Sequence, residues 1–493
     1  MPNSVRCRSL AAGFLASVTI GLFALNWAFD VPVANQHTYM VHAGLLLGWP
    51  GLAQDWFAHT VDPALLVTLV SAAAWRLGGP AGIAALYAGC CLTFTGCWWR
   101  LATGRFALGP LALFLALPVL LPPFLNPLNM FLSYGFAEQY FLGGYWQPSE
   151  AAGAALLLGL VLCILDRPYA AVLAAAAAAL LHPGSLLPAG LVAGTVVLDL
   201  ALRRRWRAAA GAAALHALGI LPVLVYALLA LGPQAAEGAR ILVHERIPHH
   251  TLPAEWLGPR TAFCLLLVAA AMLAFRRDRR VLLTLSVPTA AGILLSLGVG
   301  LAQRDTLYLL FPWRISATLV PLAWILLSIA AGRGMARRLP NSLADWAARP
   351  AGRLLAIALV LAGAAVAPFS PFARTVYRRD HAAALLGWLR SETTPADILV
   401  IPLEAEWVRL KAGRAVLVDW KSNPFRGEEV VEWWRRVGLS RRITDGFCTT
   451  GRMPAEAAGV ATLILVDRQA GCRADPEGAA YLDRDFAVYR LGG

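Results

Sequence analysis

Residues 26–63 read NWAFDVPVANQHTYMVHAGLLLGWPGLAQDWFAHTVDP and lie between two strongly apolar segments. Before the C-terminal quarter of the chain, no other stretch holds acids and histidines so densely. Its ionisable side chains are Asp30, His37, His42, Asp55, His59 and Asp62. Ionisable groups are costly near a bilayer, so a cluster of this kind indicates a functional site. The alternative interpretation is a solvated loop that carries three acids.

The composition around this stretch is that of a membrane protein. Of the 493 residues, 58% are apolar and 14% are charged, whereas a soluble protein carries roughly a quarter of charged residues. Apolar runs of about 18 residues, the length that crosses roughly 30 Å of hydrocarbon, recur through the first three quarters. We therefore expect an α-helical polytopic membrane protein. The apolar segments are 10–29, 63–77, 81–99, 107–121, 150–165, 169–181, 184–202, 208–231, 259–275, 281–301, 306–331 and 352–369.

Basic residues predict how these segments are oriented. The net charge is +13, and arginine runs at 203–207, 276–280 and 333–338 each lie between two apolar segments. The positive-inside rule explains all three runs as cytoplasmic loops, so they are not interpreted as a nucleic-acid surface. The run 10–29 is long and ends in bulky residues, which indicates a retained first span with a cytoplasmic N-terminus rather than a cleaved signal peptide.

The same rule places loops 30–62, 122–149 and 232–258, and everything after residue 370, on the exoplasmic side. Twelve full spans would put both ends of the chain on the same side of the membrane, which contradicts a cytoplasmic N-terminus with an exoplasmic C-terminal segment. We therefore expect 11 or 13 spans. The transmembrane domain is then 1–370.

Residues 371–493 predict a small soluble domain. Apolar strands at 398–403, 415–420, 461–467 and 486–491 alternate with helical stretches at 381–390 and 428–437. This order is typical of an α/β domain with a mostly parallel sheet. Asp419 and Asp467 fall at strand ends, where such sheets bind ligands, although both also suit helix capping or the surface. An exoplasmic location would allow a disulfide between Cys448 and Cys472.

A second ionisable cluster lies in the loop 232–258, at His244–His250. Its Arg246 has the fork of donors that suits phosphate or carboxylate, and His249 and His250 can donate or accept hydrogen bonds. Arg314 lies in the apolar stretch YLLFPWRISATLVP and can either bind an anion or extend to the membrane interface. No cysteine and histidine spacing indicates a zinc site.

Three groups of residues together resemble a known family. They are Asn35-Gln36-His37 with Asp55-Trp56-Phe57, the stretch Arg246-Ile-Pro-His-His250, and the tail motifs RAVLVDWKSNPF (414–425) and EWWRR (432–436). These residues resemble an uncharacterised family of bacterial polytopic membrane proteins, which is itself similar to the type C (GT-C) glycosyltransferases. The resemblance implies a GT-C-like fold and transfer of a sugar from a polyprenyl-phosphate donor in the membrane to an acceptor on the exoplasmic face.

In the GT-C superfamily an acidic residue follows the first span, and Asp30 holds that position here. Many relatives have a second acid beside the first, whereas Val31 and Pro32 follow Asp30 and the next acid is Asp55. The resemblance therefore leaves open which carboxylate acts as the base and whether a divalent metal takes part; no metal ligands are assigned.

The chemistry of glycosyl transfer suits these residues. A carboxylate such as Asp30 or Asp55 can act as the general base for an acceptor hydroxyl. Cations can bind the phosphate leaving group, and the candidates are Arg246, His249, His250 and Arg314. His37 and Glu138, which lies in the aromatic stretch 122–149, are further candidates. We expect the first loop and the 246–250 loop to form one cavity. The alternatives are a lipid-linked sugar flippase or transporter, and a non-catalytic partner in envelope assembly.

Overall fold

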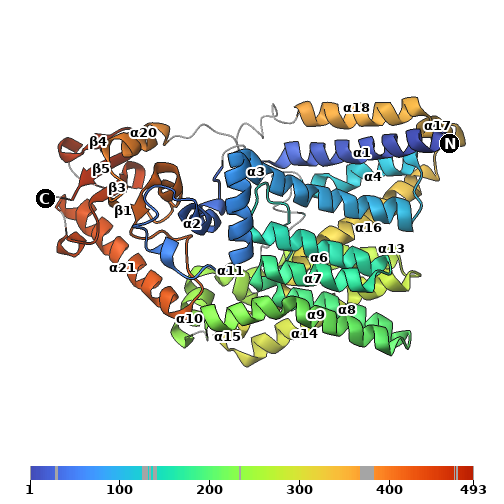
Figure 1. Cartoon of the computed structure of the whole chain (residues 1–493), viewed down its shortest axis with the longest axis horizontal. Coiled ribbons are helices and arrows are strands. Elements are labelled where there is room, and N and C mark those ends of the chain that lie inside the picture. The colour runs from blue at the N-terminus through green and yellow to red at the C-terminus, as the bar shows by residue number, and fades with distance from the viewer. Residues whose placement is uncertain are drawn as a thin grey trace. The chain divides into compact units, whose positions relative to one another are not determined.

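The computed structural model describes residues 2–27, 31–124, 132, 135–136, 141–232, 235–366, 382–452, 454–470, 472 and 476–491. It divides into two compact units (Figure 1). We call the first the helical unit; it comprises Met1–Ala28, Ile83–Tyr226 and Ile247–Val376. The second, the mixed unit, comprises Phe29–Gly82, Ala227–Arg246 and Tyr377–Gly493. The mixed unit thus combines most of the predicted C-terminal domain with the first loop, which the sequence analysis assigned to the transmembrane domain.

The helical unit is built from apolar helices and short connecting turns. Many of the helices begin with proline in the first turn, where its missing N–H costs no hydrogen bond. The helices of this unit are α1 (Pro2–Asn26), the C-terminal part of α3 (Leu65–Trp99), α4 (Pro110–Leu120), α6 (Pro148–Ile164), α7 (Pro168–Leu181), α8 (Leu186–Leu202), α9 (Trp206–Tyr226), α11 (Pro248–Thr251), α12 (Pro253–Trp256), α13 (Pro259–Ala274), α14 (Arg279–Ala302), α15 (Asp305–Tyr308), α16 (Ser316–Ala336), α17 (Asn341–Ala348) and α18 (Pro350–Val366).

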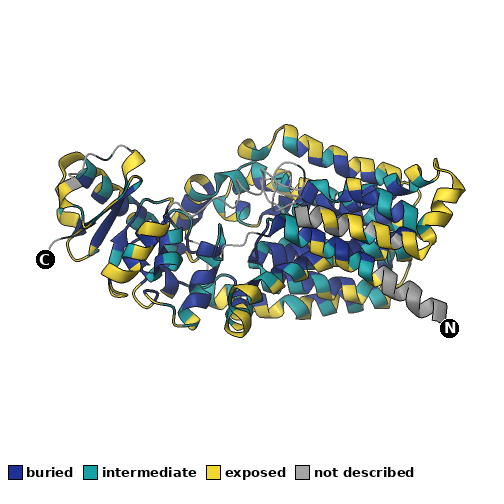
Figure 2. Ribbon diagram, turned by 90° about the horizontal axis from the view of Figure 1, so that it is seen from above, coloured by how far each residue is buried: buried dark blue, intermediate teal, exposed yellow. Residues whose placement is uncertain are grey.

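Length and composition make this a multi-pass membrane protein. In the described part of the chain, five helical segments are long and apolar enough to cross a membrane, and six further apolar helices have 10–17 residues. The five segments are Leu65–Arg105, Pro183–Leu202, Trp206–Leu231, Arg279–Ala302 and Asp305–Ala336. Exposed residues follow the outer faces of the helices (Figure 2). Leu218 and Leu301 are 67% and 87% exposed, as expected for side chains that face lipid. The number of spans stays a prediction.

Small residues allow the helices of this unit to pack closely. A Cβ atom on Gly332 of α16 would lie 2.3 Å from the carbonyl oxygen of Ala112 in α4. A Cβ on Gly159 of α6 would lie 3.2 Å from the carbonyl oxygen of Ala171 in α7. Lipid tails are as apolar as leucine, so helices in a membrane associate through such close backbone contacts.

The mixed unit contains a five-stranded sheet in the order β2-β1-β3-β5-β4. The predicted parallel arrangement is found for β2, β1 and β3, whereas β5 is antiparallel to both β3 and β4. A short turn joins β4 to β5, and strands joined in that way run antiparallel. The expectation of a mostly parallel sheet therefore does not hold for the pairings of β5. The elements of this unit are α2 (Gln36–Leu46), the N-terminal part of α3, α10 (Ala236–Arg240), α20 (Ala383–Glu392), β1 (Ile398–Val400), β2 (Ala415–Val416), α21 (Gly427–Thr450), β3 (Leu463–Asp467), β4 (Tyr481–Leu482) and β5 (Phe486–Arg490), with the π-helical turns η7 (Ile241–Arg246) and η10 (Arg409–Gly413).

Side-chain alternation places one helix on each face of this sheet (Figure 1). Leu463 and Leu465 of β3 and Val488 of β5 belong to one buried cluster with the leucines of α20. The neighbouring Tyr489 points to the other face, where its ring lies 4.8 Å from that of Phe447 in α21. Successive strand residues point to opposite faces, so the unit has the layers α20, sheet and α21.

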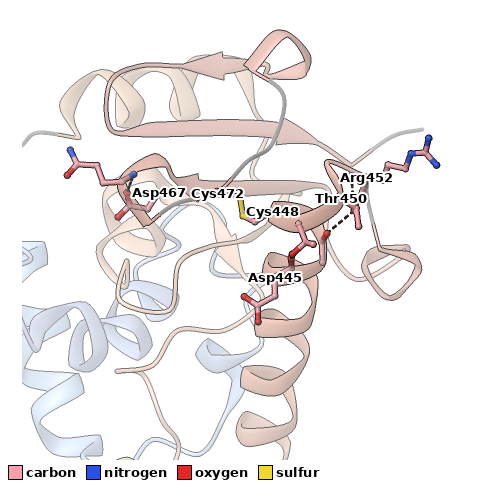
Figure 3. The surroundings of a disulfide bond; sticks show 9 residues. Asp445, Cys448, Thr450, Arg452, Asp467 and Cys472 are labelled. Atoms are coloured by element: carbon pink, nitrogen blue, oxygen red, sulfur yellow. Dashed lines mark hydrogen bonds between the residues drawn. A yellow bond between two sulfur atoms is a disulfide. The ribbon is translucent and has the colours of Figure 1, made fainter.

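Cys448 and Cys472 form a disulfide, which confirms the prediction (Figure 3). Their Cα atoms are 4.6 Å apart. Cys448 lies near the C-terminal end of α21, and Cys472 lies beyond the end of β3. The bond therefore attaches the helix to the connection between β3 and β4. Disulfides persist mainly in oxidising compartments, which agrees with an exoplasmic location for this unit.

Candidate functional site

A buried ion-pair network in the mixed unit joins the first loop to the C-terminal segment. Arg409 donates from Nε to Asp55 Oδ2 at 2.7 Å and from Nη1 to Asp419 Oδ2 and to Ser422 Oγ, the latter at 2.9 Å. The side chains of Asp55, Arg409 and Asp419 are at most 1% exposed. Asp55, which lies 354 residues from Arg409 in sequence, thus joins Arg409 and Asp419 in one charged cluster, with two carboxylates and one guanidinium.

Local backbone structure fixes each member of this network. Asp55 Oδ1 accepts from the backbone N–H of Ala58 at 3.1 Å, as a residue at the start of a helical turn does. Asp55 Oδ2 also accepts from the N–H of Val416, at 3.0 Å. Gly51 and Gly413 both have positive φ, and a Cβ on Gly51 would lie 2.6 Å from the Gly413 carbonyl oxygen. Only glycine allows the two backbones to approach so closely.

The network keeps its charges although it is buried. Burial alone would lower the pKa of Arg409, but the charges of Asp55 and Asp419 outweigh it and raise that pKa. Asp419 Oδ1 accepts from the N–H groups of Lys421 and Ser422, at 2.8 and 2.6 Å. Both oxygens of Asp55 are occupied, so its carboxylate holds the first loop in place. A catalytic role for Asp55 stays a prediction, and this geometry does not support it.

Two further contacts hold the first loop on α21. The N–H of Val61 donates to the Glu429 carboxylate, at 3.1 and 3.2 Å. The guanidinium of Arg436 lies 4.6 Å from the centre of the Trp56 ring, within the range of a cation–π interaction. The EWWRR motif therefore contributes to the packing of the first loop through Arg436.

Arg246 belongs to the same unit and lies beside the network. Its Nη2 donates to the carbonyl oxygen of Lys421 at 3.1 Å, and its guanidinium lies 5.9 Å from the Trp420 ring. Its Nε is buried and has no hydrogen-bond partner among the described residues. Burial lowers the pKa of Arg246, and Asp419 counters this effect in part. Arg246 is thus linked to the network through Asp419 and Lys421, while the single cavity expected between the first loop and the 246–250 loop stays a prediction.

His37 lies on α2 and is 4% exposed. Burial lowers its pKa to about 3, and the charges of Lys411, Lys421 and Arg409 act in the same direction. The ring is therefore neutral at physiological pH. Its Nδ1 is buried without a hydrogen-bond partner in the described part of the chain. Such an atom indicates a position where water or a ligand can bind.

The remaining predicted cations lie in the helical unit. Arg314 lies with its guanidinium 4.2 Å from the centre of the Phe311 ring and its Nη1 3.5 Å from His182 Nε2. The N–H of Gly184 donates to His182 Nδ1 at 3.1 Å. Burial lowers the pKa of His182 to about 3, and the charge of Arg314 contributes. Because Nδ1 accepts a hydrogen bond, the proton of the neutral ring is on Nε2. The Nε2–H group of His182 and the guanidinium of Arg314 are therefore two hydrogen-bond donors that lie close together.

His249 and His250 lie in α11, with their ring centres 4.1 Å apart. The indole N–H of Trp313 donates to the carbonyl oxygen of His250 at 2.8 Å, and the rings of Trp256 and Trp313 are 5.1 Å apart. Trp313, which precedes Arg314, is 1% exposed. The aromatic pair thus connects the histidine-bearing turn to the Arg314 segment inside the helical unit.

Two predicted site residues, Asp30 and Glu138, lie outside the described residues, so their roles stay predictions. Within the described ranges, no three or more His, Cys, Asp or Glu side chains gather in a way that could hold a metal ion. The predicted phosphate-binding residues are divided between the units, with Arg246 in the mixed unit and His249, His250 and Arg314 in the helical unit.

Sequence reasoning missed two residues of these clusters. Arg409 is 354 residues from Asp55, and the only local signal was an arginine between apolar residues in EWVRLKAG. Nothing in the sequence places His182, which lies between the apolar segments 169–181 and 184–202, beside Arg314. In both cases the partner lies on a distant segment, and periodicity does not predict such contacts.

Comparison with known proteins identifies the fold. A family model described as a domain of unknown function (DUF6798) matches residues 381–439, which include Arg409 and Asp419. No curated protein matches the sequence. Two crystal structures of ArnT from Cupriavidus metallidurans resemble the chain, each at 15% sequence identity and over 99% of this chain and 98% of that one. The TM-score is 0.53 for the apo structure and 0.50 for the structure bound to undecaprenyl phosphate.

These similarities define the class of fold. ArnT is a type C glycosyltransferase, so the chain has a GT-C-like fold, as its resemblance implied. The match to a domain of unknown function agrees with the uncharacterised family that the sequence resembles.

Proposed function

We propose that this protein is a membrane glycosyltransferase of the GT-C type. It moves a sugar from a polyprenyl-phosphate donor to an acceptor on the exoplasmic face of the bacterial inner membrane. The observation that carries this proposal is the similarity to ArnT over 99% of the chain. A shared fold alone is an argument by analogy, so the proposal also depends on the chemistry of particular residues.

The hydrogen-bond donors of His182 and Arg314 support binding of the phosphate of the polyprenyl-phosphate sugar donor. The N–H group of His182 and the guanidinium of Arg314 are both hydrogen-bond donors, so neither can accept from the other. A phosphate oxygen accepts from both, and such charge-assisted bonds are stronger than neutral ones. The ArnT structure contains undecaprenyl phosphate, an anion on an apolar chain. We assign the donor phosphate to Arg314 and His182, with His249 and His250 on the neighbouring turn.

Arg246 is a separate cation of the mixed unit. Its buried Nε without a partner among the described residues leaves one donor for a substrate oxygen. In the transition state the leaving phosphate gains negative charge while the acceptor hydroxyl loses its proton to a base. Cations of the kind described here stabilise the first change, and a carboxylate performs the second.

Binding of the lipid tests the donor site. We expect the purified protein to bind undecaprenyl phosphate in detergent, and Arg314→Gln to weaken this binding by about 10-fold or more, because a charged hydrogen bond is lost. Arg304→Gln is the matched control, since Arg304 is exposed in the same unit, and it should bind within about twofold of the wild type. If the wild type does not bind the lipid, or if both variants bind equally, the assignment is wrong.

Asp30 is the proposed general base, because it directly follows the first span. Asp30→Asn retains shape and hydrogen bonding but cannot accept the proton. We expect this variant to insert normally and to lose about 10²–10⁴ in rate, measured as glycan product in a deletion strain. Asp55→Asn should instead reduce the amount of folded protein. If Asp55→Asn folds normally and loses product while Asp30→Asn restores it, the base is Asp55. If both restore full product, this loop is not catalytic.

A further inference from the structure

The mixed unit contains a cavity of about 820 Å³, and the proposed phosphate-binding residues Arg314, His182, His249 and His250 are not among the described residues that line it. One wall comes from the first loop and α3, with Trp49 and Trp75. The other comes from α20 and η10, with Arg390, Lys411 and Arg414. Small-molecule sites usually measure about 300–1,000 Å³, so this cavity can hold a headgroup or a small molecule.

The charge of the lining is positive. Four basic residues and no acidic residue lie among the described residues that form it. The charge of one of them, Arg409, is balanced by Asp55 and Asp419. Arg390 and Arg414 form no ion pair with a carboxylate in the described part of the chain. Arg390 Nε donates instead to the carbonyl oxygen of Lys411, at 2.9 Å.

Arg414 is held in the same way by neutral acceptors. It is 5% exposed, and it donates from Nε to Thr393 Oγ1 at 2.6 Å and from Nη2 to the carbonyl oxygens of Thr393 and Arg390, at 2.7 and 3.1 Å. Burial lowers its pKa, the charge of Asp397 acts in the opposite direction, and the smaller effect of Arg390 lowers the pKa further. Fixed cations that repel one another form a preorganised site, because an anion would relieve the repulsion without rearrangement.

The opposite wall is aromatic and continues into an apolar surface. The rings of Trp49 and Trp75 are 4.8 Å apart and nearly perpendicular. Trp75 lies in α3, whose N-terminal part also exposes Leu69 by 50% and Leu77 by 90%. In a membrane protein, exposed leucines of this kind face lipid, and tryptophan prefers the membrane–water interface. The ligand chemistry that suits this combination is an anionic group beside an apolar chain or ring.

We propose that this cavity is a second anion-binding site, which takes a phosphate- or carboxylate-bearing headgroup and is separate from the donor site at Arg314. Arg390 and Lys411 bind the anion at the mouth, Arg414 supplies buried positive charge, and Trp49 and Trp75 pack against the apolar part of the ligand. The anion comes either from a membrane lipid or from a soluble phosphate compound, and the same residues bind both.

Two probes distinguish these sources in the full-length protein. Pyrophosphate is titrated calorimetrically into the protein in neutral detergent. Retention of phosphatidylglycerol is measured by native mass spectrometry after release from nanodiscs of equal parts phosphatidylglycerol and phosphatidylcholine. We expect at least one probe to bind, and Arg390→Gln/Lys411→Gln to weaken that binding by about 10-fold or more, since two charged contacts are lost. Binding of pyrophosphate indicates a soluble ligand, and selective retention of phosphatidylglycerol indicates a lipid headgroup.

Control variants separate this site from loss of folding and from the donor site. Arg442→Gln/Arg452→Gln removes two exposed arginines of the same unit that do not line the cavity, and should bind as the wild type does. Arg390→Lys/Lys411→Arg retains both charges and should restore binding. Arg314→Gln should leave it unchanged, even if it abolishes binding of undecaprenyl phosphate. The proposal is overturned if neither probe binds, or if Arg390→Gln/Lys411→Gln binds as well as the control.

Discussion

Arg409 neutralises the charges of two buried carboxylates, so its loss should lower the stability of the folded protein more than the loss of an exposed ion pair does. Arg409→Met would remove the ion-pair partner of the buried Asp55 and Asp419. Removing one partner of a buried ion pair typically costs about 3–5 kcal/mol. We expect a marked fall in the melting temperature of the purified protein, because the first loop would detach from η10 and the segment after β2.

The control for this substitution is an exposed ion pair of the same unit. Arg435 contacts Glu432 at 2.7 Å, with its side chain 61% exposed, and such pairs contribute at most about 1 kcal/mol. Arg435→Gln should therefore melt close to the wild type. Adding Asp55→Asn and Asp419→Asn to Arg409→Met should recover part of the lost stability. A melting temperature of Arg409→Met equal to that of Arg435→Gln would contradict a stabilising role for the network.

His37 makes the stability of the protein depend on pH. Its pKa is about 3 in the folded protein and about 6.5 when unfolded. Between these values the unfolded chain binds more protons, so stability falls as the pH drops below about 6.5, and the loss is complete near pH 3. At pH 5 the loss from His37 is about 2 kcal/mol.

His37→Gln should therefore reduce the difference in melting temperature between pH 7 and pH 5. Met40→Leu is a suitable control, because Met40 lies in the same helix, is 1% exposed and does not titrate. Its effect on stability should be equal at both pH values. If His37→Gln leaves the pH dependence of the wild type intact, then His37 is not buried as a neutral ring.

Among the elements, α3 has a conformation that depends on one glycine. The sequence predicted two apolar segments, 63–77 and 81–99, and the structure joins them into the helix Leu65–Trp99 with a break at Gly79. Gly79 has φ 56° and ψ −137°, a combination that is strained for any residue with a Cβ atom. Pro80 follows and cannot donate a backbone hydrogen bond.

Gly79→Ala should destabilise the protein by about 1–3 kcal/mol, the usual cost of such backbone strain. Gly78→Ala is the matched control, because Gly78 has ordinary helical geometry and a Cβ there would meet no atom within 4 Å. This control should be neutral or slightly stabilising in a thermal unfolding assay. Equal melting temperatures for the two variants would show that the break is not a fixed feature of α3.

Elements were predictable where the pattern is local. The helix at 428–437 and the strands at 461–467 and 486–491 correspond to α21, β3 and β5, because hydrophobic runs and turn residues lie within each segment. The direction of β5 was not predictable, since it depends on the short strand β4, which has only two residues. The pairing of Asp55 with Arg409 could not be predicted either, because no local pattern indicates which distant cation neutralises the charge of a buried carboxylate.

At the scale of the whole molecule, composition predicted a polytopic membrane protein correctly, because the length and apolarity of the helices are set by the bilayer. The GT-C-like fold was implied by the resemblance of particular motifs to a known family. The units are not predictable in the same way. Each consists of three separate stretches of chain, and the first loop belongs with the C-terminal segment through the buried Asp55 and the partly buried Trp56 and Val61. The site residues were recognised by chemical type, while their division between the units depends on the fold.

The orientation of the molecule provides the last prediction. Three arginine runs predict cytoplasmic loops, and the disulfide between Cys448 and Cys472 agrees with an oxidising environment for the C-terminal segment. Alkaline phosphatase folds actively only outside the cytoplasm, so a fusion after residue 493 should be active. A fusion after residue 338, directly behind an arginine run, should be expressed but inactive. In cells, Cys448 and Cys472 should resist alkylation until a reductant is added. An inactive, well-expressed fusion after residue 493, together with free thiols at both cysteines, would place the tail in the cytoplasm and exclude transfer on the exoplasmic face.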